Sequence, residues 1–222
     1  VMLVCQDWGG LIGLTLPMAM PERYTRLLVM NTGLGLGTVT EGFRKWRAYN
    51  NTQPENLDFL RELRALLDRY PDVAALGEIS SEDSLATMAE YTGPERLHMG
   101  YSFELLTDDF SAGHVRSTVE ALEAKMTRGW PCWAISNHDV QRVATRWGGG
   151  EAPEHIASTL TALACSLRGS ICVFQGEELG LTEVELPFEL LQDPYGIAFW
   201  PTFKGRDGCR TPMPWTTGRN GG

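Results

Sequence analysis

The hydrophobic residues fall into two kinds of stretch that follow one another along the chain. Short, continuous apolar runs have the length of buried strands, and segments whose apolar residues recur at helical spacing separate them. This alternation predicts a parallel α/β barrel architecture, in which a helix connects each strand to the next. The strand-like runs cover residues 1–5, 27–31, 73–76, 132–135 and 170–174, and the helix-like segments cover residues 11–20, 57–67, 83–91, 115–126 and 155–167.

The composition of the chain indicates which kinds of binding partner do not fit it, namely nucleic acids, metals and membranes. The chain of 222 residues carries a formal net charge of −9, which argues against nucleic-acid binding because that requires clustered Lys and Arg. Its five cysteines are scattered, without the spacing of a zinc site or a disulfide framework. With no signal peptide and no apolar stretch of membrane-spanning length, we predict a cytoplasmic protein without cofactor, metal or membrane partner. Val1 lies within a strand-like run, so the sequence is expected to be a fragment.

A polar tetrad directly follows the apolar run at residues 132–135. It consists of Ser136, Asn137, His138 and Asp139. Ionisable groups at the carboxyl end of a buried strand are how an α/β barrel presents its active site. The alternative is that Asp139 caps the following helix, because Asp is a favoured N-cap residue. The residue types alone leave both interpretations open.

The first fifty residues have a different organisation. The strand-like run at residues 1–5 leads into Q-D-W-G-G and a helix-like segment, which is the arrangement of a nucleophile elbow with Asp7 in place of serine. Together with the later M-N-T-G and W-R-A-Y, this stretch resembles the haloalkane dehalogenases. The resemblance implies that Asp7 displaces halide and that Trp8 helps to hold it. The alternative is a generic strand–helix–strand unit with an incidental aspartate, since no histidine lies in a dehalogenase-like context.

From residue 53 onward the motifs resemble glycoside hydrolase family 13, the α-amylase superfamily. The string W-P-C-W-A-I-S-N-H-D is similar to its seventh-strand motif, L-G-E at residues 76–78 to its fifth strand, and residues 97–103 to its sixth. The run R-D-G-C-R-T-P-M-P-W at residues 206–215 resembles the loop after the eighth strand in α-glucosidases that act on short oligosaccharides. The resemblance implies strands 5–8 of a (β/α)₈ TIM barrel.

The same resemblance assigns roles to individual residues. It implies that Glu78 is the acid/base carboxylate and that Asp139 is an auxiliary carboxylate, which stabilises the transition state. His138, Asn137 and Arg142 are implied to bind the sugar. The alternatives are that Glu78 is a solvated strand end and His138 a core histidine satisfied by the backbone.

The nucleophile of the family has no clear counterpart. It belongs to a G-F-R-x-D motif, and the segment Gly42-Phe43-Arg44-Lys45-Trp46 would place Trp46 at the position of the aspartate. The surroundings of this segment resemble the dehalogenases more closely, so we interpret the G-F-R match as a coincidence. An indole cannot form a glycosyl ester, and the first strands of the family's barrel are also missing from this sequence. We therefore expect turnover to be impaired or absent.

These motifs predict a chimeric α/β chain. Residues 1–52 are expected to form an α/β-hydrolase fragment, with a strand–elbow–helix–strand unit, and residues 53–222 an α-amylase-type barrel fragment. The predicted function is that of an α-glucosidase acting on the terminal α-linked glucose of a small oligosaccharide. The alternatives are a haloalkane dehalogenase-like hydrolase that uses Asp7 and a non-catalytic fragment.

Overall fold

The computed structural model describes residues 2–6, 26–30, 52–149 and 155–218. The chain separates into two compact units, Val1–Tyr49 and Asn50–Gly222, and each has its own parallel sheet. The division lies close to the predicted junction between residues 52 and 53. The assignment of the two parts to different families stays a prediction.

The described part of the first unit is a pair of parallel strands. Strand β1 (Met2–Gln6) pairs with β2 (Arg26–Met30), and Met2 lies opposite Arg26. The sequence predicts both strands to within one residue of these bounds. The Asp7–Trp8 turn and the helix predicted at residues 11–20 lie outside the described residues. The unit of α/β-hydrolase type therefore stays a prediction.

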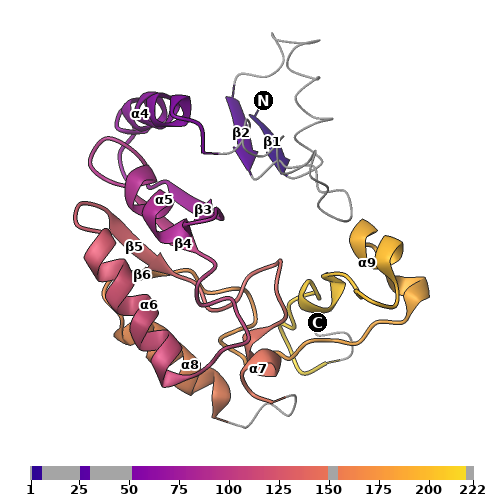
Figure 1. Ribbon diagram of the computed structural model, residues 1–222. Helices are drawn as coiled ribbons and strands as arrows, with labels where there is room; N and C mark the ends of the chain where they lie inside the picture. Colours follow the sequence, from indigo (N-terminus) through magenta and orange to yellow (C-terminus); the bar gives the residue numbers. More distant parts are fainter. Residues whose placement is uncertain (1, 7–25, 31–51, 150–154, 219–222) are drawn as a thin grey trace. The chain divides into compact units, whose positions relative to one another are not determined.

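A four-stranded parallel sheet with the order β3-β4-β5-β6 lies at the centre of the second unit. Its strands are neighbours both in sequence and in space, as in successive strand–helix units of an α/β barrel. Figure 1 shows α5, α6 and α8 along one side of this sheet. This is the predicted α/β fold, and it is consistent with part of a (β/α)₈ barrel. The elements are α4 (Glu55–Leu67), β3 (Leu76–Ile79), α5 (Ser84–Tyr91), β4 (Met99–Ser102), α6 (Ala112–Lys125), β5 (Trp130–Trp133), α8 (Ile156–Ser166) and β6 (Ser170–Ile171).

Each face of the sheet contributes to an apolar cluster of its own. Trp133 of β5 belongs to the larger cluster, together with Met88 of α5 and Leu122 of α6. The preceding residue, Cys132, belongs to a smaller cluster with Tyr101 of β4. Successive side chains of a strand point to opposite faces, so β5 packs under the helices with one side chain and toward the other face with the next. The larger cluster therefore holds β5 against the helices, and the polar tetrad follows this strand.

Local sequence signals determine where the helices begin. Asp83 caps α5 by accepting a hydrogen bond from the backbone N–H of Ala86 at 3.0 Å, and Ser111 caps α6 in the same way. Pro54 directly precedes α4, where its missing N–H removes no helical hydrogen bond. None of the described helices is long and apolar enough to cross a membrane.

One local prediction is wrong, and the structure contradicts one of the alternatives. The strand predicted at residues 73–76 lies at Leu76–Ile79, because pairing with β4 sets its register, and Glu78 is therefore inside the strand and opposite Tyr101. Asp139 does not cap the following helix, since α7 (Val143–Arg146) begins after Arg142. The carboxylate of Asp139 is thus not engaged by a helix terminus and can take part in a site.

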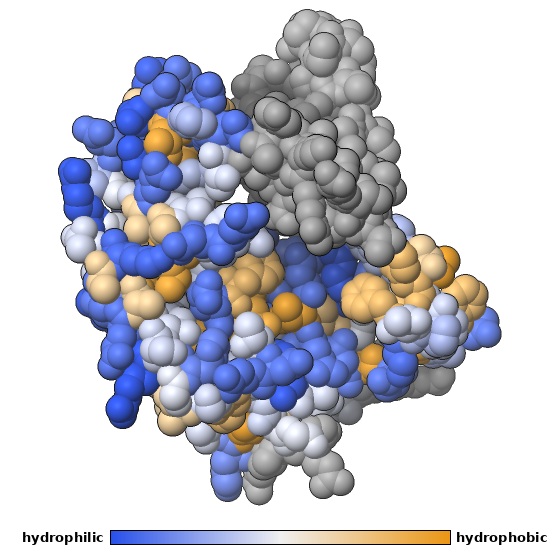
Figure 2. All heavy atoms as spheres, viewed as in Figure 1, coloured by the Kyte–Doolittle hydropathy of each residue, from blue (hydrophilic) through white to orange (hydrophobic). Residues whose placement is uncertain are grey.

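Residues 184–215, here called the C-terminal arm, contain only short helical segments, as the Gly- and Pro-rich sequence predicts. Among them is α9 (Pro194–Phe199). Figure 2 shows apolar side chains gathered where α9 lies in Figure 1. The arm is tied to the turn after β5 by hydrogen bonds from Arg206 and Arg210. Its exposed large apolar residues are Val184, Phe188, Leu190, Ile197, Phe199, Trp200, Phe203 and Trp215.

The packing of the helices on the sheet leads to a first prediction. Leu122 of α6 is 1% exposed, and its truncation to alanine is expected to lower the free energy of unfolding by about 2–5 kcal/mol through lost burial and a cavity. Leu66 of α4 is 46% exposed, and Leu66→Ala is the matched control, with an expected loss below about 1 kcal/mol. Urea unfolding followed by circular dichroism measures both, and equal losses would contradict this description of the core.

Candidate active site

Glu78 lies at the carboxyl-terminal half of β3 and has two hydrogen-bond donors from neighbouring strands. The hydroxyl of Tyr101, its partner in the β3–β4 register, donates to Oε1 of Glu78 at 2.5 Å. Burial, followed by the hydrogen bond to Glu78, raises the pKa of Tyr101 well above its ordinary value, so the phenol stays protonated and remains a donor. Sequence reasoning missed Tyr101, because only the strand register places its ring beside Glu78.

Asn137 connects the two candidate carboxylates. Its Nδ2 donates to Oε1 of Glu78 at 3.1 Å, and its Oδ1 accepts a hydrogen bond from the backbone N–H of Asp139 at 2.9 Å. The residue is only 5% exposed, so both ends of its amide are used inside the protein. Asn137 was predicted to bind sugar directly. In the structure it orients the groups on either side of it, and direct sugar binding stays a prediction.

His138 and Asp139 complete a cluster with Glu78. One ligand-type atom of each residue lies within 4.8 Å of the others. Nε2 of His138 is 3.6 Å from Oδ1 of Asp139, which is too long for a hydrogen bond. Their side chains are 28% and 25% exposed, so a ligand in solution can reach both. The structure thus brings together the three residues at the carboxyl ends of parallel strands, while their catalytic roles stay predictions.

Two arginines of the C-terminal arm contact the carboxylate of Asp139. Nη1 of Arg206 donates to Oδ1 at 2.7 Å, and Nη2 of Arg210 donates to the same oxygen at 2.9 Å. Nε of Arg210 also donates to the backbone carbonyl of His138 at 2.8 Å. The motif R-D-G-C-R marks this loop in the sequence, but nothing in its spacing indicates which carboxylate the two arginines reach.

Arg142 was predicted to bind sugar, and the structure places it in the interior. The residue is 2% exposed, and its Nη1 donates to the backbone carbonyl of Gln175 at 2.9 Å. The guanidinium lies over the ring of Phe174, 5.1 Å from its centroid. These contacts join the turn after β5 to the loop after β6. They indicate a structural role, and a substrate contact for Arg142 stays a prediction.

The charges of the cluster favour a neutral ligand over a cation. Glu78, His138 and Asp139 have the atom types and the spacing for a divalent metal. However, two guanidinium groups already contact Asp139, and a metal ion would be held at short range from these like charges. The hydroxyl groups of a sugar, which donate and accept hydrogen bonds without carrying charge, are a better match for this cluster.

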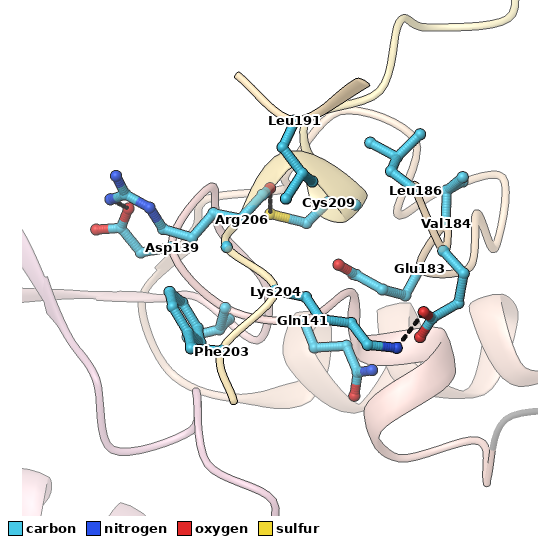
Figure 3. Close-up of a pocket in the computed structure, with 14 residues that line it drawn as sticks. Asp139, Gln141, Glu183, Val184, Leu186, Leu191, Phe203, Lys204, Arg206 and Cys209 are labelled. Carbon is cyan, nitrogen blue, oxygen red and sulfur yellow. Dashed lines mark hydrogen bonds and ion pairs between the residues drawn. The ribbon is translucent and has the colours of Figure 1, made fainter. Parts of the chain in front are cut away.

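A cavity of about 230 Å³ adjoins Asp139. It lies between the turn after β5 and the C-terminal arm, and Figure 3 shows the side chains of Asp139 and Arg206 at one end and those of Val184 and Leu186 at the other. The lining combines apolar side chains with carboxylates and with Lys204, which forms an ion pair with Glu185. The cavity is therefore amphipathic and extends the candidate site on the side of Arg206.

Glu177 is a buried carboxylate in the loop after β6. It is 6% exposed, and burial raises its pKa to about 7, although a hydrogen bond from the backbone N–H of Phe174 opposes this shift. The nearby charges of Arg142 and Arg146 also lower the pKa. Sequence reasoning did not single out Glu177, because the run Q-G-E-E does not show which glutamate faces inward.

Fold and site together define a class of protein. Carboxylates gathered at the carboxyl-terminal edge of a parallel α/β sheet, with hydrogen-bond donors around them, are typical of hydrolases built on an α/β barrel. Comparison with known families leads to the same class and narrows it. The family described as "Alpha amylase, catalytic domain" matches residues 34–222. The chain belongs to this family, glycoside hydrolase family 13.

Individual relatives are α-glucosidases and related enzymes. A Rhizobium meliloti (strain 1021) protein named "Probable alpha-glucosidase" is 48% identical over 178 residues, covering 78% of this chain and 32% of the relative. The oligo-1,6-glucosidase of Parageobacillus thermoglucosidasius is 26% identical over 211 residues, covering 78% of this chain and 37% of the relative. The chain thus spans about a third of the length of these curated relatives.

Solved structures share the fold of the chain. The crystal structure of the α-glucosyl transfer enzyme XgtA matches with a TM-score of 0.75 and 70% sequence identity, covering 78% of this chain and 32% of that one. Isomaltulose synthase from Klebsiella sp. LX3 matches with a TM-score of 0.69 and 21% identity, covering 87% of this chain and 42% of that one. The family match begins at residue 34, upstream of the predicted junction. The dehalogenase resemblance of residues 1–50 stays a prediction.

The buried position of Glu177 predicts how stability depends on pH. Because the pKa rises from 4.5 to about 7 on folding, the folded state binds this proton more tightly, and stability present below pH 4.5 is lost as the pH rises to 7. The loss is at most about 3 kcal/mol. Glu177→Gln should remove it, so urea unfolding between pH 5 and 7.5 should show a smaller pH dependence in the variant. The exposed Glu123→Gln is the control, and parallel curves for Glu177→Gln and the native chain would contradict the prediction.

Proposed function

We propose that the cluster around Glu78 is the glucose-binding site of an α-glucosidase-type enzyme, with little or no turnover in this chain. The ligand is the terminal α-linked glucose of a short oligosaccharide. The observation that carries the proposal is the gathering of Glu78, His138 and Asp139 within 4.8 Å at the ends of parallel strands. The names of the relatives, "Probable alpha-glucosidase" and oligo-1,6-glucosidase, support the class of substrate.

Each residue of the cluster has a role that suits its surroundings. Glu78 would give its proton to the glycosidic oxygen as the bond breaks, and the donors Tyr101 and Asn137 hold its carboxyl group in one orientation. Asp139 would accept hydrogen bonds from sugar hydroxyls with the oxygen that the two arginines do not contact. His138, which is partly exposed, would hydrogen-bond a hydroxyl of the same ring.

The cluster lacks a group that is well suited to act as the nucleophile. A retaining glycosidase needs a second carboxylate about 5–5.5 Å from the acid, and this group attacks the anomeric carbon. Among the described residues the cluster offers only Asp139 near Glu78, and two guanidinium groups hold its Oδ1. Positive charge at this oxygen stabilises the carboxylate and lowers its tendency to attack.

The solved structure with 70% identity is that of an α-glucosyl transfer enzyme, which favours a second reaction at the same site. Hydrolysis and transfer share the bound α-glucosyl group and differ in whether water or an alcohol accepts it. The amphipathic cavity beside Asp139 lies where an acceptor could be held. Both reactions require the same nucleophile, so the proposal of little turnover covers both.

The alternatives concern other classes of function. A haloalkane dehalogenase-like hydrolase would use Asp7 and Trp8, which lie outside the described residues. A non-catalytic fragment would bind sugar weakly or not at all.

We expect no measurable release of nitrophenol from 4-nitrophenyl α-D-glucoside. Without a nucleophile, general acid catalysis supplies only about 10²–10⁴-fold, far less than a complete enzyme. A spectrophotometric assay with the native chain and with Glu78→Gln measures this. Turnover that disappears in Glu78→Gln would prove the expected inactivity wrong and would mean that another carboxylate acts as the nucleophile. Bromide release from a short bromoalkane that disappears in Asp7→Ala would instead support the dehalogenase alternative.

A further inference from the structure

The C-terminal arm contains a carboxylate that is entirely enclosed by protein. The side chain of Asp193 is 0% exposed, and its two oxygens accept hydrogen bonds from Arg206 through the backbone N–H at 2.9 Å, Nε at 2.8 Å and Nη2 at 3.1 Å. The backbone N–H of Tyr195 donates to it at 3.2 Å. Burial alone would raise the pKa of Asp193, but these hydrogen bonds outweigh it and hold the pKa below its ordinary value. Asp193 is therefore a buried, fully paired anion.

Arg206 joins this buried anion to the candidate active site. While Nε and Nη2 face Asp193, Nη1 reaches Oδ1 of Asp139 at 2.7 Å. The guanidinium also lies over the ring of Tyr195, 5.2 Å from its centroid, which limits its rotation. A planar guanidinium with several donors can bridge two carboxylates in a fixed geometry, whereas a lysine cannot.

The backbone around Asp193 is itself fixed. Oδ2 of Asp207 accepts hydrogen bonds from the backbone N–H groups of Gln192 and Asp193, at 2.7 and 2.8 Å. The two ends of the arm segment that carry Asp193 and Arg206 are thus tied to each other. Gly196 and Gly205 allow their close approach, because a Cβ at Gly205 would lie 2.8 Å from Cα of Gly196.

Asp139 needs such support, because it lies in a turn and not in a strand. Its backbone N–H is held by Asn137, but its carboxylate has no hydrogen bond from the sheet among the described residues. Nε2 of the adjacent His138 is 3.6 Å from its Oδ1, beyond hydrogen-bond distance. The orientation of the carboxylate therefore depends on Arg206 and Arg210.

We propose that Asp193 is a positioning residue that acts through Arg206 to orient the Asp139 carboxylate toward the sugar. The role of Asp139 in this inference rests on the proposed function. Arg206 and Asp139 also line the cavity described above, so the contact between them forms part of its lining (Figure 3). Because the side chain of Asp193 is 0% exposed, it cannot contact a ligand itself and would act on binding through Arg206.

The experiment uses the full chain and two measurements. The first follows the ¹³Cγ signal of Asp139 by NMR without ligand in Asp193→Asn, which keeps the shape and removes the charge. The second determines the Kd for methyl α-D-glucoside in Asp193→Asn, Asp139→Asn and the double variant. Asp68→Asn, which breaks the exposed Arg64–Asp68 ion pair at the end of α4, is the matched control. Arg206→Lys repeats the test if Asp193→Asn fails to fold.

We expect the Asp139 signal to move in Asp193→Asn and Arg206→Lys but not in Asp68→Asn. The Kd should rise about tenfold in Asp193→Asn and show no further rise when Asp139 is already asparagine, because coupled residues give non-additive effects. An unmoved Asp139 signal, or an equal rise in both backgrounds, would overturn the proposal. If the native chain binds no glucoside while the signal moves, the proposed function fails and the positioning contact stands.

Discussion

The candidate site depends on the two hydrogen bonds of Asn137. One reaches Glu78 at the end of β3, and the other reaches the backbone of Asp139 after β5, so a single buried amide sets the spacing of the two carboxylates. This is possible only because β3, β4 and β5 run parallel and end at the same edge. The apolar cluster under the helices holds these strands together and thereby fixes the distance that Asn137 spans.

The charges around Asp139 favour one chemical role for its carboxylate over another. Arg206 and Arg210 bring two positive charges to Asp139, and Asp193 balances part of this charge from the interior of the arm. A carboxylate stabilised in this way is suited to accept hydrogen bonds from hydroxyl groups and poorly suited to attack a carbon atom. The same contacts that orient Asp139 therefore support sugar binding and oppose its use as a substitute nucleophile.

The sequence allowed the parallel α/β order to be predicted, because strand-like runs and helical spacing are local signals. Family motifs singled out Glu78, His138 and Asp139, although the strand that carries Glu78 lies three residues later than predicted. The contacts that Arg206, Arg210 and Tyr101 make with these residues could not be predicted from the sequence. Arg206 and Arg210 lie 67 and 71 positions from Asp139, and only tertiary packing brings them to its carboxylate. Tyr101 depends on the register of β4 against β3. Arg142 lies close to the tetrad in sequence, yet the turn after Asp139 directs it into the interior.

An NMR titration of the ¹⁵N-labelled chain with D-glucose tests the central claim most directly. If Glu78, His138 and Asp139 form a glucose site, the backbone amide signals that move on titration should be those of these residues and of Tyr101 and Asn137. The same titration of Asp139→Asn should show smaller shifts at the same positions. Unmoved signals for these residues at saturating glucose, or shifts confined to other parts of the chain, would contradict the account.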